Sequence, residues 1–146
     1  MTILLDAGPL GMIAHPRSSP ENDACKNWLA SVAVRGATIV LPEIADYEVR
    51  RELIRAEKVM GLARLDALKA LLTYAPISTA VMLRAAEFWA TARNAGRPAT
   101  DDSALDADMI LGAQAFERSE PDVVVATTNP RHLTLFCDAR HWRDIA

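Results

Sequence analysis

Short apolar runs alternate with stretches of helical periodicity, and this alternation limits the possible folds more than any other feature of the chain. Strands are expected at residues 2–5, 37–41, 74–77 and 123–126. The last run is nearly all β-branched, as is typical of strands inside parallel sheets. Strands that alternate with helices form right-handed crossovers and a sheet covered on both faces. We therefore expect an α/β fold with three α/β/α layers and a mainly parallel central sheet of four or five strands.

Local signals predict where the helices begin and end. Ser19 and Ser78 are good N-caps, whereas Gly36 and Gly96 are expected helix stops. In the first half of the chain we expect a turn at Gly8-Pro9, a helix opened by Pro42 and a helix break at Gly61. In the second half we expect a loop at 97–100 before a helix that runs through Phe116, and a last short helix capped by Asn129-Pro130. The tail is expected to pair as an edge strand or to dock on the core through Trp142 and Ile145.

Length and composition indicate one domain spanning residues 1–146. The chain is 51% hydrophobic, which argues against disorder. No apolar run approaches the roughly 20 residues that a membrane-spanning helix needs. The first strand begins at residue 2 with no basic segment or cleavage signal before it, so we expect a cytoplasmic protein without a membrane partner.

Four acidic or amide residues stand where apolar segments break. They are Asp6, Glu48, Asp108 and Asn129. A carboxylate beside buried surface is costly unless its charge is compensated, and a hard cation compensates several at once. In parallel sheets, ligands bind at the carboxyl ends of the strands, where Asp6 and Asn129 are expected. Glu48 lies about two turns into its helix, on a face shared with Ile44, Tyr47 and Arg51 that we expect to look inward. Asp108 lies early in its helix, so both acids could reach the same edge of the sheet. The pattern therefore favours a metal-dependent hydrolase.

The charge pattern is compatible with local binding of a polyanion. The net charge of −3 argues against the broad basic surface of a non-specific nucleic-acid binder. Four arginines nevertheless lie close together in the sequence, at Arg50, Arg51, Arg55 and Arg64. Arginine binds phosphate oxygens bidentately, so these residues predict a phosphate-binding strip. The alternative is a solvated helix face with pairs such as Glu52 with Arg55.

Four segments together resemble the successive motifs of PIN-domain proteins, most closely the VapC-type toxins. These segments are residues 4–10, 47–53, 105–115 and 125–133, in an order and strand or helix context that spans nearly the whole chain. The resemblance implies an endoribonuclease that depends on Mg²⁺ or Mn²⁺. It also implies a homodimer that a small VapB-type antitoxin holds inactive, with RNA as the substrate.

The resemblance also implies roles for individual residues. Asp6 and Asp108 correspond to the primary metal ligands, and Glu48 to a ligand through water or an orienting base. Asn129 stands where many members have a further aspartate, and Asp106 is a possible replacement for that charge. Water or phosphate is expected to be positioned by Asn129 with Thr127 or Thr128, and substrate to be bound by Arg50 and Arg51.

Other interpretations of these residues remain open at this stage. Asp6 could form a turn, Glu48 could be a helix-surface acid, Asp108 a partner of the helix dipole, and Asn129 an N-cap. A phosphatase with an aspartate nucleophile would need a second aspartate two residues after Asp6, where the chain has Gly8. The main alternative function is a catalytically weak PIN-like module that binds RNA or protein without cutting.

Overall fold

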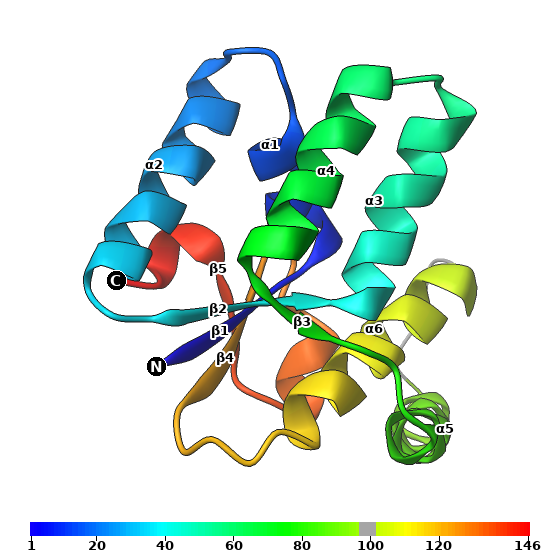
Figure 1. Ribbon diagram of the computed structural model, residues 1–146. Helices are drawn as coiled ribbons and strands as arrows, with labels where there is room; N and C mark the ends of the chain where they lie inside the picture. The colour runs from blue at the N-terminus through cyan, green and yellow to red at the C-terminus, as the bar shows by residue number, and fades with distance from the viewer. Residues whose placement is uncertain (97–101) are drawn as a thin grey trace.

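A five-stranded parallel sheet with the order β3-β2-β1-β4-β5 forms the centre of the molecule (Figure 1). The computed structural model describes residues 1–96 and 102–146, so the loop expected at 97–100 lies outside the described residues. The strands are β1 (Thr2–Leu5), β2 (Thr38–Pro42), β3 (Thr73–Ala75), β4 (Val123–Thr127) and β5 (Ala139–His141). All four strand pairings are parallel. The predicted fold class is confirmed.

Six α-helices and two short 3-10 helices connect and follow the strands in the described residues. They are α1 (Ala7–Ala14), α2 (Pro20–Val34), α3 (Glu43–Arg55), α4 (Val59–Leu71), α5 (Thr79–Asn94), α6 (Asp102–Phe116), η1 (Leu133–Leu135) and η2 (Trp142–Asp144). Helices α1 to α4 lie on one side of the sheet and α6 on the other, with α5 packed against α6 (Figure 1). None of these helices is both long and apolar enough to cross a membrane.

Alternation along the strands divides the core between the two faces. Ile3 and Leu5 pack with residues of α1, α2 and α4, whereas Leu4 points the other way and packs with Leu111 of α6. Because successive strand residues point to opposite faces, both faces of each central strand are apolar. This double burial explains the continuous apolar runs in the sequence.

The predicted N-caps are confirmed. The Ser19 hydroxyl accepts a hydrogen bond of 3.1 Å from the backbone N–H of Asn22, and the Ser78 hydroxyl accepts one of 3.1 Å from that of Val81. Each such cap satisfies a backbone donor that the first helical turn leaves free, which stabilises the helix by about 1 kcal/mol. Helices α2 and α5 therefore begin where the sequence indicates.

Three local predictions are wrong. Helix α1 begins at Ala7, with Gly8 and Pro9 inside its first turn, where proline is tolerated because no intrahelical donor is lost. Helix α4 continues through Gly61 instead of breaking there, and a side chain at Gly61 would come within 2.8 Å of Leu53. The short helix after β4 is η1, whose N-cap position is His132 and not Asn129.

The C-terminal tail both pairs and docks. Strand β5 extends the sheet beside β4, and Trp142 and Ile145 are then buried against α2. The Trp28 indole N–H donates a hydrogen bond of 2.8 Å to the Ile145 carbonyl, and the Trp28 and Trp142 rings lie 5.7 Å apart. The tail therefore closes one edge of the sheet.

The face of α3 that contacts the core differs from the predicted face. Ile44, Ala45 and Asp46 are buried at its first turn, whereas Tyr47 and Arg51, which were expected to look inward, are exposed. The early turns are buried because α3 leaves β2 between the two core clusters and contacts both. Glu48 lies at the boundary of the buried and exposed faces and is half-buried.

Candidate active site

Asp6 and Thr127 lie side by side at the carboxyl ends of β1 and β4. The register pairs Leu5 with Ala126, so the next residue of each strand stands beside the other. The Thr127 hydroxyl donates a hydrogen bond of 2.6 Å to Asp6 Oδ2, and the Ala7 backbone N–H donates one of 2.7 Å to Asp6 Oδ1. The Asp6 carboxylate is thus held by one donor on each oxygen and also caps α1. Capping and a role in the site are compatible.

Thr127 also fixes the chain that follows β4. It is fully buried, and its hydroxyl oxygen accepts a hydrogen bond of 3.0 Å from the Asn129 backbone N–H. Because a hydroxyl carries a single proton, which here goes to Asp6, Thr127 has none left to donate to a phosphate. Two roles are possible for Thr127, namely orienting Asp6 and contacting the substrate as predicted. The structure favours the first role.

Thr128 and Asn129 are exposed beside the start of α1. A side chain at Gly8 would come within 2.8 Å of the Thr128 hydroxyl oxygen, so α1 and the loop after β4 are in close contact at Gly8. The Asn129 side-chain oxygen accepts a hydrogen bond of 3.4 Å from the Arg131 backbone N–H and caps no helix. Both side chains are thus exposed in the loop that directly follows Thr127, the residue that binds Asp6.

Glu48 and Asp108 approach from two helices. Glu48 lies in the second turn of α3, and Asp108 lies about two turns into α6, beyond the first turn in which the helix dipole acts. Both are half-buried. The dipole interpretation of Asp108 and the surface interpretation of Glu48 are therefore not favoured.

The three carboxylates are electrostatically coupled. Burial raises the pKa of Asp6, against the lowering effect of its hydrogen bonds from Thr127 and Ala7. Burial and the charge of Asp6 raise the pKa of Glu48, which Arg51 partly offsets. Burial, together with the charges of Asp6 and Glu48, raises the pKa of Asp108 to about 7. Residues from β1, α3 and α6 therefore share one acidic site.

Several solved structures are similar to this chain over nearly its whole length. The structure is similar to VapBC2 from Rickettsia felis bound to a promoter DNA fragment, with a TM-score of 0.75 and 15% identity over 97% of this chain and 99% of that one. It is also similar to FitAcB from Neisseria gonorrhoeae, with a TM-score of 0.71 and 18% identity over 98% and 99%. For VapBC-1 from nontypeable Haemophilus influenzae the TM-score is 0.67 and the identity 13%, over 99% and 100%.

The chain has the PIN-domain fold. The resemblance to VapC-type proteins is thereby confirmed at the level of the fold. No family model matches the sequence, and the search of curated proteins also finds no match. Identities of 13–18% show the fold alone, since one fold can carry unrelated functions.

The residues of this PIN fold fit a divalent cation in their donor chemistry. Carboxylate oxygens are the ligands that Mg²⁺ prefers. The charge of Asp6 raises the pKa of Glu48, and the charges of Asp6 and Glu48 raise that of Asp108, as expected for neighbouring negative charges with little compensation. No group of three His, Cys, Asp or Glu side chains within residues 1–96 and 102–146 is close enough to hold a metal ion as placed. Charge coupling extends over many ångströms, whereas Mg²⁺ binds oxygen at about 2 Å, so binding would need side-chain movement.

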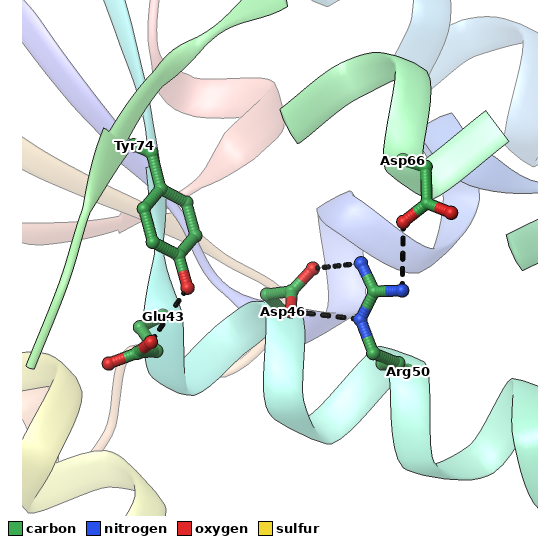
Figure 2. Close-up of polar contacts among 5 residues, drawn as sticks. All are labelled: Glu43, Asp46, Arg50, Asp66 and Tyr74. Atoms are coloured by element: carbon green, nitrogen blue, oxygen red, sulfur yellow. Dashed lines mark hydrogen bonds and ion pairs between the residues drawn. The ribbon is translucent and has the colours of Figure 1, made fainter. Parts of the chain in front are cut away.

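The structure separates the two arginines that were predicted to bind substrate. The Arg50 guanidinium contacts Asp46 through two hydrogen bonds of 3.0 and 3.1 Å and Asp66 of α4 at 2.8 Å (Figure 2). All three of its nitrogens are engaged, and it links α3 to α4. Arg51 forms no ion pair with any described residue, and it is exposed beside Glu48. Substrate binding is therefore favoured for Arg51 over Arg50.

The remaining arginines of the predicted strip do not form a continuous surface. Arg55 pairs with Glu52 at 2.8 Å, as the alternative interpretation expected. Arg64 donates to the Ile13 carbonyl at 3.4 Å. A binding strip along all four arginines is therefore not supported.

Two further features bear on the site. Asp106, considered as a replacement for the missing aspartate, is exposed and lies beside Trp89 of α5, about 200° around α6 from Asp108. The start of α3 is fixed by Glu43, which accepts a hydrogen bond of 2.9 Å from the Tyr74 hydroxyl (Figure 2). Glu43 also accepts one of 2.8 Å from the Ile77 backbone N–H. Glu43 was not among the predicted residues, although an acid in the first turn of a helix is a recognisable signal.

Proposed function

We propose that the chain is a metal-dependent endoribonuclease that hydrolyses RNA phosphodiester bonds, and that residues 1–146 form a single PIN-like domain. The observation that carries the proposal is the coupling of Asp6, Glu48 and Asp108 at the carboxyl edge of a PIN-type sheet. Three coupled carboxylates at the position where α/β folds bind ligands favour a cation and an anionic substrate.

Each residue has a defined part in this proposal. Asp6 and Asp108 would hold Mg²⁺ or Mn²⁺, with Glu48 acting through a water molecule or orienting the attacking water. When bound, the metal supplies polarisation of the phosphate and a nucleophile from water. Thr127 holds the Asp6 carboxylate in one orientation through its 2.6 Å hydrogen bond. Asn129 and Thr128, exposed beside Asp6, would position water or phosphate.

Single-turnover RNA cleavage with varied Mg²⁺ or Mn²⁺ tests the proposal. We expect cleavage by the wild type that depends on the metal, and loss of at least about a hundredfold in Asp108→Asn, because the amide removes a ligand charge. Circular dichroism should show that the variant is folded. Equal cleavage by folded wild type and Asp108→Asn would remove Asp108 from the site.

The alternative is a PIN-like module that binds RNA or protein without cutting. The presence of Asn129 at the position of an aspartate, and the spacing of the acids in the described residues, favour this second function. It predicts no cleavage at any concentration of Mg²⁺ or Mn²⁺. Calorimetry would then show no metal binding at millimolar concentration.

A groove beside Glu48 supports an antitoxin-like partner. It has a volume of about 830 Å³ and lies between α1, α3 and the start of α4. Small residues of α1 form one wall, and Val49 and Leu53 of α3 contribute apolar surface. We propose that a VapB-like segment lays apolar side chains here and directs a cationic side chain toward Glu48. A gene for a small protein with a basic, partly disordered end is expected next to the gene for this chain.

Gly11 offers a direct test of the groove. It lines the groove, and a Cβ atom added at Gly11 would meet no atom within 4 Å, so the first atom of a new side chain has room. Gly11→Leu should therefore fold, fill the groove and weaken inhibition by the co-expressed neighbour at least about tenfold. Ala30→Leu on the exposed side of α2 is the matched control. Inhibition of Gly11→Leu as strong as that of the control would place the partner elsewhere.

We also propose that the chain forms a homodimer. Sedimentation equilibrium of the purified protein tests this prediction.

A further inference from the structure

Tyr47 and Arg51 form a stacked pair on the outer face of α3. The Arg51 guanidinium carbon lies 5.1 Å from the centre of the Tyr47 ring, within the range of a cation–π contact. The two residues are four positions apart, so they share one face of the helix. The Tyr47 side chain is 55% exposed, which is high for an aromatic residue in a structured helix.

This pair adjoins the acidic site. Successive helix residues turn by about 100°, so Arg51 lies roughly 60° and Tyr47 roughly 100° from Glu48 around α3. Arg51 is near enough to lower the pKa of Glu48. A strand of nucleic acid whose phosphate reached Glu48 would therefore pass the face of α3 that carries Tyr47 and Arg51.

The other arginines of α3 are committed to different contacts. Arg50 binds Asp46 and Asp66, and Arg55 binds Glu52. Arg51 has no ion pair with a described residue, and the Tyr47 hydroxyl has no hydrogen bond to one. The pair thus presents an aromatic ring and a planar cation, both of which stack on nucleobases.

We propose that Tyr47 and Arg51 form a stacking site for one unpaired base of the RNA, next to the scissile phosphate. The inference rests on the proposed function and adds to it a subsite for one base, formed by these two side chains. Bases in a duplex are stacked on their neighbours and cannot be inserted against the ring. The site therefore selects loops and unpaired segments.

The test is a titration of a short single-stranded RNA that contains a fluorescent base analogue, in EDTA so that no metal-dependent cleavage occurs. Wild type and Tyr47→Phe should quench the analogue, because both keep an aromatic ring. Tyr47→Leu should bind about tenfold more weakly and not quench, as expected for the loss of one base–aromatic contact. Phe116→Leu is the matched control, since Phe116 is 51% exposed beneath the Arg84 guanidinium at 4.7 Å but is the last residue of α6, about two turns beyond Asp108.

The outcomes separate this inference from the proposed nuclease. Equal affinity and quenching for Tyr47→Leu and wild type, or equal binding of duplex and single strand, would overturn the stacking site even if the enzyme cleaves RNA. Quenching that requires an aromatic residue at position 47 would support the site even if no cleavage is found. With active enzyme, Tyr47→Leu should raise KM about tenfold and leave kcat nearly unchanged.

Discussion

The Thr127 hydroxyl donates a hydrogen bond of 2.6 Å to the Asp6 carboxylate, and so joins the ends of β1 and β4 at the centre of the acidic site. The parallel register places these residues side by side, since Leu5 is paired with Ala126. A donor that orients a carboxylate influences its affinity for a cation without touching the cation.

The first prediction concerns this hydrogen bond. Thr127→Val keeps the buried shape and removes the donor, so we expect metal affinity to fall about tenfold and the pKa of Asp6 to rise further. Thr127→Ser keeps the donor and should bind metal like the wild type. Isothermal titration calorimetry with Mn²⁺ measures both. If valine and serine behave alike, the hydroxyl does not orient Asp6.

The second prediction is a pH dependence of stability caused by Asp108. Its pKa is raised from 3.8 to about 7 by burial and by Asp6 and Glu48, so the folded state binds a proton that the unfolded state releases between these values. The contribution of Asp108 to the free energy of unfolding should therefore fall as pH rises from about 4 to about 7, and stay constant above. Asp108→Asn should lose this component. Urea unfolding of both proteins in EDTA across this range makes the comparison, and parallel curves would contradict it.

The third prediction is that a divalent cation stabilises the folded chain. Mg²⁺ or Mn²⁺ at about ten times its Kd should raise Tm by about 3–5 °C, because it binds the folded state selectively and relieves repulsion among the carboxylates. Asp6→Asn should reduce this gain. Differential scanning calorimetry with matched EDTA samples provides the measurement. A wild-type Tm that does not respond to millimolar metal would argue against the metal site.

The fourth prediction isolates Asn129. Asn129→Asp adds a negative charge beside Asp6 and should tighten binding of Mn²⁺ severalfold. Asn129→Ala should leave metal affinity nearly unchanged and slow single-turnover cleavage about tenfold, since it removes an amide that positions water or phosphate. Unchanged affinity in the aspartate variant would show that position 129 lies outside the site.

The fifth prediction contrasts two pairs of charges on α3. Arg50→Ala leaves the buried Asp46 without its cation and should destabilise the fold by about 2 kcal/mol. Arg55→Ala breaks only the exposed pair with Glu52 and should cost less than about 1 kcal/mol. Urea unfolding of the variants compares them. Equal stability would mean that the Arg50 contacts in Figure 2 do not hold α3 to α4.

Much of the fold could be predicted because its signals are local. The strands at Thr2–Leu5 and Val123–Thr127 are apolar runs that fit a sheet covered on both faces. Ser19 and Ser78 each cap the helix that begins at the next residue. The start of α1 at Ala7 and the path of α4 through Gly61 were not predicted, because neighbours distant in sequence help to decide them. At Gly61, for example, the absence of a side chain leaves room for Leu53 of α3, which a Cβ atom there would approach to 2.8 Å.

The sequence by itself determined the parallel α/β order and placed Asp6 and Asn129 after strands, since strand periodicity and strand ends are properties of short segments. Only the tertiary structure decided how the side chains are used. It directs the Thr127 proton to Asp6, commits Arg50 to Asp46 and Asp66, and leaves Arg51 stacked on Tyr47 in solvent. Arg50 and Arg51 are adjacent in α3 but have different contacts, because each helix residue points about 100° from the next. Which element packs against each direction depends on the whole fold.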